Sequence, residues 1–342
     1  MDKDIKVAIV GAGRTGRGFI ARLFHKQADI VFIDTDKSLV ENLRRQGGYV
    51  VRYFDGRTPD YIDGFSAYSP DESAAAIYEC HVIFVSIGAE NAGAAEVWLS
   101  DKINPSACVI LCENAPRPAD LFTDALSERA CSAAVFCTTV GDGELDIQSE
   151  NYPCLYTDDR ISETAAGLDG IISVPDFDIL MIRKIYTYNA ASAVIAYLGA
   201  KKGYCEYPDA ANDAEIAREL DSFYAEINCA ICAEYGIDPR EQAEFAELSR
   251  RKFQNRAIKD SVERNAANPA RKLSAGERII APARLILKHG GSADALVKTA
   301  AAAIEYMGAK DAREAERILT DICGINMNES IFGKIMSWLN YK

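Results

Sequence analysis

Histidine is scarce in this chain of 342 residues, which has three, at positions 25, 81 and 289. The Cys-x-x-Cys spacing of Cys229 and Cys232 has no second cysteine pair and no histidine near it. A structural zinc site needs about four ligands, most often cysteine and histidine. The sequence therefore indicates no metal site, and we expect a protein that works without a metal.

Long hydrophobic runs are also absent. The most apolar long stretch, from Ile185 to Leu198, is too short to span a bilayer and contains Asn189 and Ser192. The first four residues lead directly into an expected strand, so we expect no signal peptide. Ten cysteines, mostly scattered through apolar runs, are typical of buried thiols in a reducing compartment. These features predict a cytoplasmic protein with no membrane partner.

Positive charge is in short supply, because 38 lysines and arginines face 51 acidic residues and leave a net charge of −13. Nucleic acids and anionic membranes both require a basic surface, so neither is expected as a partner. Residues 250–288 reverse the balance with eleven basic and three acidic residues. This segment is either a set of solvated helix faces with paired charges or a site for an anionic small molecule.

The first half of the chain alternates apolar, β-branched runs with helical patterns. Such alternation predicts an α/β fold built on a Rossmann-type, doubly wound parallel sheet. The expected strands are Ile5–Val10, Ile30–Asp34, His81–Ile87, Ala107–Cys112 and Ala133–Thr139. The expected helices are Thr15–His25, Lys37–Arg45, Glu72–Tyr78, Ala92–Leu99 and Ala119–Leu126. Residues 49–69 are less regular.

The second half has a different pattern, without a convincing strand from Leu180 onward. We place the domain boundary near residue 176, giving a nucleotide-binding domain of residues 1–176 and a mostly helical domain of residues 177–342 that holds the substrate. The expected helices are Leu180–Leu198, Ala211–Tyr235, Pro239–Phe253, Gly276–Lys288, Ser292–Tyr306, Asp311–Ile322 and Glu329–Asn340.

A glycine-rich loop follows the first strand and leads into a helix. Gly11 permits a tight turn, Gly13 lets the backbone approach a pyrophosphate, and Gly16 lets helix and strand pack closely. The backbone N–H groups and the positive end of the helix dipole, around Arg14 and Thr15, bind phosphates. The loop predicts a dinucleotide site.

Asp34 ends the second strand about 20 residues after the loop, at the separation expected for an acid that binds the adenosine ribose. It accepts hydrogen bonds from ribose hydroxyls and repels a 2′-phosphate, which favours NAD over NADP; otherwise it is a helix cap or turn residue. Ser86 and Gly88 lie at the end of the strand expected at residues 81–87, where such folds pass beside the nicotinamide half; otherwise they form an ordinary strand-to-helix turn.

The apolar helix after residue 180 contains Lys184, Asn189 and Ser192. At about 100° per residue, Asn189 lies about 140° and Ser192 about 80° from Lys184, so the three share one side. A buried lysine loses hydration, which lowers its pKa toward the range of a general base. Asn189 would hold a substrate oxygen. Alternatively, Lys184 reaches to the surface and Asn189 bridges helices.

Several segments resemble the polyol-specific long-chain dehydrogenases, the mannitol dehydrogenase family, over nearly the whole chain. They are Gly11–Ile20, the strand ending at Asp34, Cys112–Asn114, Lys184-x4-Asn189, Ala196–Gly199, Arg251–Asn255, Asn268–Leu273 and Arg278–Arg284. The resemblance implies a metal-independent enzyme that is monomeric or loosely associated. It implies that Lys184 is the general base, and that Asn114 and Asn189 flank the reacting oxygen.

One residue departs from this family's pattern, in which a histidine stands three residues after the asparagine. Here the position is Ser192, which forms hydrogen bonds but does not share a proton at neutral pH. We expect Lys184 to suffice for turnover, with Ser192 altering the substrate or its orientation. Segment 140–145 also departs from the pattern.

The basic segment now supplies candidate substrate ligands. Arg251, Lys252, Asn255, Arg271 and Lys272 would bind a sugar phosphate or a carboxylate. We therefore expect an NAD-dependent oxidoreductase that interconverts a polyol phosphate and a keto-sugar phosphate. Two alternatives stay open: an oxidoreductase for uronates or free polyols, and a protein that binds NAD(H) without catalysis.

Overall fold

Short β-branched runs in the first half form the main sheet of the computed structural model, which describes residues 4–339. The strands lie in the order β5-β2-β1-β6-β7-β8-β11-β12. The first six are parallel, while β11 runs antiparallel to β8 and parallel to β12. This is the strand order of a doubly wound dinucleotide-binding sheet with two strands added, so the predicted fold class is confirmed. The strands are β1 Lys6–Val10, β2 Asp29–Ile33, β5 Ser66–Tyr68, β6 Val82–Val85, β7 Cys108–Leu111, β8 Ala130–Ala134, β11 Leu155–Thr157 and β12 Ile171–Ser173.

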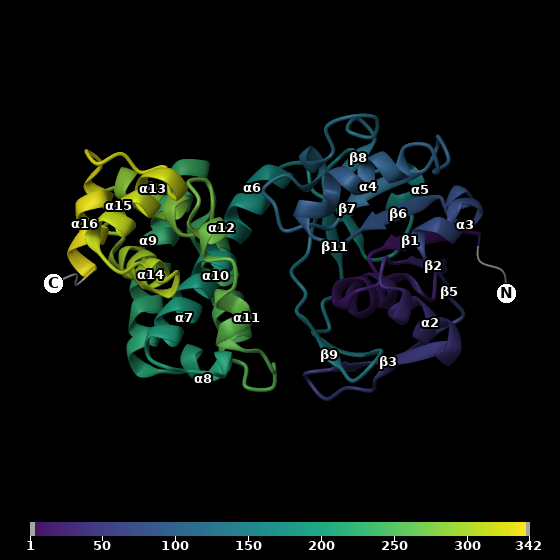
Figure 1. Cartoon of the computed structure of the whole chain (residues 1–342), viewed down its shortest axis with the longest axis horizontal. Coiled ribbons are helices and arrows are strands. Elements are labelled where there is room, and N and C mark those ends of the chain that lie inside the picture. Colours follow the sequence, from purple (N-terminus) through teal and green to yellow (C-terminus); the bar gives the residue numbers. More distant parts are fainter. Residues whose placement is uncertain (1–3, 340–342) are drawn as a thin grey trace. The chain divides into compact units, whose positions relative to one another are not determined.

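Both faces of this sheet are buried, because adjacent residues of one strand enter different hydrophobic clusters. Phe84 of β6 packs in one cluster with Phe24, at 5.1 Å between stacked rings, while its neighbour Ile83 packs in the other. Helices and short helical turns follow the strands (Figure 1). They are η1 Gly16–Ala21, α1 Arg22–Phe24, α2 Lys37–Gln46, η2 Pro70–Glu72, α3 Ala74–Tyr78, η3 Ala89–Asn91, α4 Ala92–Leu99, η4 Pro118–Leu121 and α5 Glu163–Ala166.

A second, smaller sheet has the order β4-β3-β10-β9 and packs on η1. Its strands are β3 Gly48–Tyr53, β4 Asp60–Asp63, β9 Thr139–Asp142 and β10 Asp146–Ser149. A Cβ atom on Gly18 would lie 2.3 Å from Ile147 of β10, so glycine is required there. The irregular segment 49–69 therefore contains strands, and the strand predicted at residues 133–139 is wrong, because β8 ends at Ala134 and β9 begins at Thr139.

The helix predicted at residues 119–126 is also wrong, since only the short turn η4 forms there. The cause lies elsewhere in the chain. The buried carboxylate of Glu96 accepts the backbone N–H groups of Thr123, Asp124 and Leu126 at 2.8–3.0 Å. These bonds replace the hydrogen bonds that a helix would have made.

The chain divides into two compact units, Met1–Met181 and Ile182–Lys342, where the sequence placed the boundary at residue 176. The described part of the second unit is helical around a core of its own, with an isolated bridge between Glu206 and Ser261. Its elements are the end of α6 Phe177–Arg183, η5 Lys184–Asn189, α7 Ala190–Lys201, α8 Tyr207–Ala211, α9 Ala214–Tyr235, α10 Pro239–Gln254, α11 Val262–Ala266, α12 Pro269–Leu273, α13 Ile280–Lys288, α14 Asp294–Tyr306, α15 Ala312–Arg317, η6 Ile318–Ile322 and α16 Ser330–Trp338. Asn340, the last residue of the final predicted helix, lies outside the described residues. No helix in residues 4–339 is both long and apolar enough to cross a membrane.

Candidate functional site

Two residues of the glycine loop are held so tightly that no side chain fits. A Cβ atom on Gly11 would lie 2.1 Å from the Ser86 carbonyl oxygen, and φ there is +99°. A Cβ atom on Gly16 would lie 2.1 Å from the Gly11 carbonyl oxygen. Gly13 is different, because its missing side chain faces open space, with no atom within 4 Å. The loop is therefore packed on one side and free to receive a ligand on the other.

A cavity of about 600 Å³ opens beside this loop, at the carboxyl ends of β1, β2 and β6. It brings together four of the predicted cofactor residues, Gly11, Gly13, Asp34 and Ser86. The other four, Arg14, Thr15, Gly16 and Gly88, belong to the same two loops but are not among the lining residues. The lining residues that sequence reasoning missed are Val10, Ile33, Thr35, Pro70, Ile87, Asn91, Ala94, Ala95 and Trp98. Trp98 is one of two tryptophans in the chain, which was a signal that sequence reasoning left unused.

Asp34 is fixed by backbone contacts and stays partly open to the cavity. One carboxylate oxygen accepts the Ala12 N–H at 2.7 Å, and the other accepts the Asp36 N–H at 2.9 Å. Among the described residues, no lysine or arginine lines this cavity. The negative charge of Asp34 therefore suits ribose hydroxyls and disfavours the additional 2′-phosphate of NADP.

Glu113 supports the cavity wall from behind. Its buried carboxylate accepts the N–H groups of Ile87 and Gly88, at 2.7 and 3.0 Å. Burial raises the pKa of Glu113 to about 7, partly offset by these two hydrogen bonds, and the nearby Glu90 raises it further. Glu113 thus sets the path of the loop after β6, a role that its place in the sequence does not reveal.

Lys184 of the second unit is 5% exposed, as its apolar surroundings in the sequence predicted. Burial lowers its pKa to about 7, and the charges of Arg278 and Lys252 lower it further, while Glu277 opposes the shift. A lysine whose pKa lies close to physiological pH can both accept and return a proton. The side chain therefore has the property that a general base needs.

Lys184 and Asn189 are joined by a π-helical turn, which the sequence did not reveal. The N–H of Ala190 bonds to the carbonyl of Ile185, five residues earlier, and η5 spans Lys184–Asn189. Residues five apart lie about one turn apart in such a segment, so Asn189 comes closer to the side of Lys184 than the angle of about 140° in a regular helix. The wider turn is the physical reason for the Lys-x4-Asn spacing.

The opposite side of the same segment is anchored to α10. Arg183 donates to Gln242 at 3.0 Å, and Gln242 donates to Thr187 at 3.1 Å. The guanidinium of Arg183 also lies 4.7 Å from the centre of the Phe245 ring. These contacts fix the rotation of the helix, and with it the direction of Lys184.

Arg278, whose charge acts on Lys184, also acts on a second buried lysine, Lys272. Lys272 and Arg278 are each 7% exposed, and one nearby carboxylate, Glu277, accepts from Arg278 at 3.0 Å. Burial lowers the pKa of Lys272 to about 7, and the charges of Arg278, Arg271 and Arg264 lower it further, with Glu277 opposing. One terminal nitrogen of Arg278 is buried without a hydrogen-bond partner. An excess of buried positive charge of this kind suits an anionic ligand.

Other basic residues of segment 250–288 form ion pairs near the surface. Arg251 pairs with Glu247 at 2.8 Å and is exposed, and the exposed Asn255 bonds to the Ala257 N–H at 3.0 Å. Arg271 lies 3.8 Å from Glu277. The ion pair of Arg251 and the backbone hydrogen bond of Asn255 explain these two residues as well as a bound ligand would.

The remaining predicted catalytic residues lie in different units. Asn114 is exposed, three residues beyond the end of β7 in the first unit, while the half-buried Ser192 stands one turn after Asn189 in the second. Within the described residues, no group of three or more histidine, cysteine, aspartate and glutamate side chains is arranged to hold a metal ion.

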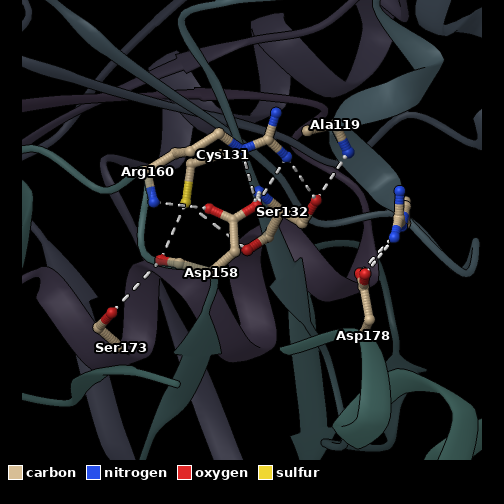
Figure 2. Close-up of polar contacts among 8 residues, drawn as sticks. Ala119, Cys131, Ser132, Asp158, Arg160, Ser173 and Asp178 are labelled. Carbon is tan, nitrogen blue, oxygen red and sulfur yellow. Dashed lines mark hydrogen bonds and ion pairs between the residues drawn. The ribbon is translucent and has the colours of Figure 1, made fainter. Parts of the chain in front are cut away.

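A second cavity of about 450 Å³ lies in the first unit, and its charged groups bind one another (Figure 2). Asp158 accepts from Arg160 at 2.8 Å and from the Ser132 N–H at 2.9 Å. Arg117 pairs with Asp178 of α6. This network ties the segment after β7 to the start of α6, and it reads as a structural connection.

Comparison with known protein families gives two matches. Residues 176–331 match the mannitol dehydrogenase C-terminal domain, and residues 7–117 match the TrkA-N domain. Among individual proteins, the chain is 27% identical to mannitol-1-phosphate 5-dehydrogenase of Bacillus velezensis, over 96% of this chain and 98% of the relative. It is 26% identical to the enzyme of that name from Podospora anserina, over 97% of this chain and 95% of the relative.

Solved structures support the same fold. Mannitol 2-dehydrogenase of Pseudomonas fluorescens, in a ternary complex with NAD and D-mannitol, matches with a TM-score of 0.73 at 13% identity. The alignment covers 99% of this chain and 91% of that one. A substrate-free D-sorbitol dehydrogenase gives a TM-score of 0.73 at 14% identity, over 98% and 93% of the two chains.

Proposed function

We propose that the chain is a member of the mannitol dehydrogenase family and an NAD-dependent oxidoreductase that interconverts a polyol phosphate and a keto-sugar phosphate. Its residues 176–331 match that family's C-terminal domain, and two mannitol-1-phosphate 5-dehydrogenases align with nearly its whole length. The observation that carries the proposal is the buried guanidinium of Arg278, one of whose terminal nitrogens has no hydrogen-bond partner, with the charges of Arg271 and Lys272 nearby. A phosphate would accept a hydrogen bond from this nitrogen and add the negative charge that favours cations around it, whereas a neutral polyol would add no charge.

The residues of the first unit fit a dinucleotide. The open side of Gly13 receives the pyrophosphate, Asp34 binds the adenosine ribose, and Ser86 and Gly88 pass beside the nicotinamide half. The absence of cations from the lining residues of this described cavity favours NAD over NADP. When bound, NAD supplies the site that accepts or returns the hydride.

Lys184 accepts and returns the proton of the substrate hydroxyl. In the oxidation direction its neutral amine takes the proton from the substrate hydroxyl as the carbon loses hydride, and in the reduction direction its ammonium returns that proton to the carbonyl oxygen. Asn189, one π turn away, holds this oxygen and stabilises the charge that develops on it.

The phosphate is held by the Lys272 ammonium and the Arg278 guanidinium. Lys272 donates to the Asn265 carbonyl, and its ammonium lies 5.9 Å from the Tyr197 ring, which leaves donor capacity for a phosphate. The unpartnered nitrogen of Arg278 offers a further donor. Lys252 and Arg271, whose charges act on Lys184 and Lys272, would attract the anion to the site.

Reduction of fructose-6-phosphate, fructose and tagaturonate with NADH tests the proposal. Activity on the phosphate ester supports it, and activity confined to the unphosphorylated compounds would refute the phosphate assignment. NADH binding without turnover of any of them would favour a non-catalytic protein. Lys184→Ala should abolish turnover and retain NADH affinity, which separates loss of chemistry from loss of folding.

A further inference from the structure

Tyr207 carries one of the few buried polar atoms without a hydrogen-bond partner in the described chain. Its side chain is buried, and no donor or acceptor lies in hydrogen-bond geometry with its hydroxyl oxygen. Of the polar side chains that act on this hydroxyl, Ser192 on α7 has the largest effect; the others are Tyr224, Asp260 and Arg264. A buried hydroxyl left in this condition destabilises a fold, so its retention calls for a reason.

The position of Tyr207 is fixed from several directions. Its backbone N–H donates to the Asp260 carbonyl at 2.9 Å, and its ring meets Phe253 edge-to-face at 5.9 Å. Helix α8, which Tyr207 begins, packs so closely on α7 that a Cβ atom on Gly199 would lie 2.8 Å from that of Ala210. The phenol therefore has little freedom to turn away from Ser192.

Ser192 connects this buried phenol to the candidate catalytic residues. It lies three residues after Asn189, about one helical turn along, and it is half-buried where Tyr207 is fully enclosed. A serine hydroxyl rotates freely unless a neighbour fixes it. Burial keeps the pKa of Tyr207 well above its usual value, with Ser192 opposing the shift, so the phenol stays a proton donor at all physiological pH values.

We propose that Tyr207 is a positioning residue: its hydroxyl donates to the Ser192 oxygen and thereby aims the Ser192 proton at the substrate oxygen held by Lys184 and Asn189. The inference rests on the proposed function. The Tyr207 contact is outside hydrogen-bond geometry in this structure, and contacts of this kind tighten when a substrate binds. No proton is transferred from the pair: Ser192 accepts a hydrogen bond from Tyr207 and donates one to the substrate oxygen, and both hydroxyls keep their protons.

Three variants test the pair: Tyr207→Phe, Ser192→Ala and the double variant. If the two hydroxyls act as one unit, each single change should lower kcat about tenfold with little effect on KM, because one transition-state hydrogen bond is lost. The double variant should lose no more than either single variant. Losses that multiply in the double variant would show that the hydroxyls act independently and would overturn the inference.

Thermal unfolding gives a second readout, with Tyr224→Phe as the matched control. Tyr224 is equally buried, but its hydroxyl bonds to Ser249 at 2.5 Å. Tyr224→Phe should therefore lower the unfolding temperature and leave kcat near the wild-type value, whereas Tyr207→Phe should unfold at the wild-type temperature or above it.

The inference and the proposed function fail in different ways. A wild-type chain that binds NADH but turns over none of the three carbonyl compounds would contradict the proposed function. An active wild type with an unchanged kcat in Tyr207→Phe would contradict only the inference. A fall in unfolding temperature for Tyr207→Phe as large as that for Tyr224→Phe would also contradict it, because the hydroxyl would then have a structural partner.

Discussion

Replacing Lys184 with methionine should stabilise the protein more at pH 7 than at pH 9. The change keeps the length and apolar stem of the side chain and removes the amine. In the folded protein the pKa of Lys184 is lowered to about 7, whereas an unperturbed lysine has its ordinary value of 10.5. Between these two values the unfolded chain binds more protons than the folded one, so Lys184 makes stability rise as the pH increases.

The size of the effect follows from the two pKa values. Each pKa unit corresponds to about 1.4 kcal/mol, so the rise in stability from pH 7 to pH 9 that comes from Lys184 is roughly 2 kcal/mol. Lys272, whose pKa is also lowered to about 7 by burial and by neighbouring arginines, adds to the wild-type rise with the same sign. Lys184→Met should remove the part of the rise in stability that comes from Lys184 and leave the part that comes from Lys272.

Urea unfolding followed by circular dichroism at pH 7, 8 and 9 measures this difference. The free energy of unfolding should increase with pH less steeply in Lys184→Met than in the wild type. Lys37→Met, at an exposed position, is the matched control and should retain the wild-type slope. Equal slopes in the wild type and in Lys184→Met would show that Lys184 is protonated in the folded chain, and would remove it as a base at neutral pH.

Four further outcomes are expected. For polyol oxidation, kcat/KM should rise with pH and level off above about 7, the pKa to which burial lowers Lys184; ketone reduction should fall over the same range, and identical profiles in both directions would contradict this assignment. Asp34→Ala should raise the KM for NAD about tenfold or more and narrow the preference over NADP, as steady-state kinetics with both nucleotides would show. Glu113→Ala, which removes the acceptor for two backbone N–H groups, should weaken NADH binding several-fold in fluorescence titrations, while Glu113→Gln should restore most of it. Phosphate at millimolar concentration should raise the unfolding temperature of the wild type by a few degrees and that of Arg278→Met by less, and equal shifts would exclude Arg278 from the anion site.

Local pattern was sufficient for four central strands of the main sheet and failed where distant partners decide the structure. Strands β1, β2, β6 and β7 come from continuous apolar runs, which burial on both faces of a parallel sheet requires. The small sheet joins β3 to β10, two segments far apart in the chain, and neither has such a run. The segment after η4 has a helical sequence pattern, but its N–H groups donate to the distant Glu96 carboxylate and no helix forms.

The candidate site divides in the same way. The glycine loop, Asp34 and the buried lysine follow from residue type and spacing, since each has a local reason to be where it is. The support of the loop by Glu113 and the pairing of Tyr207 with Ser192 depend on contacts between elements, which spacing does not encode.

The π turn at Lys184–Asn189 makes the register of the second unit's central helix depend on a single residue. Its five-residue hydrogen bond closes a loop one residue longer than an α turn. If the same residues formed a regular α-helix instead, with none deleted, everything before the turn would rotate by about 100° relative to α7. Arg183 would then leave Gln242, and Lys184 would leave the side of the helix that carries Asn189. In this chain the length of one helical turn, as much as the identity of its residues, determines which side chains can work together.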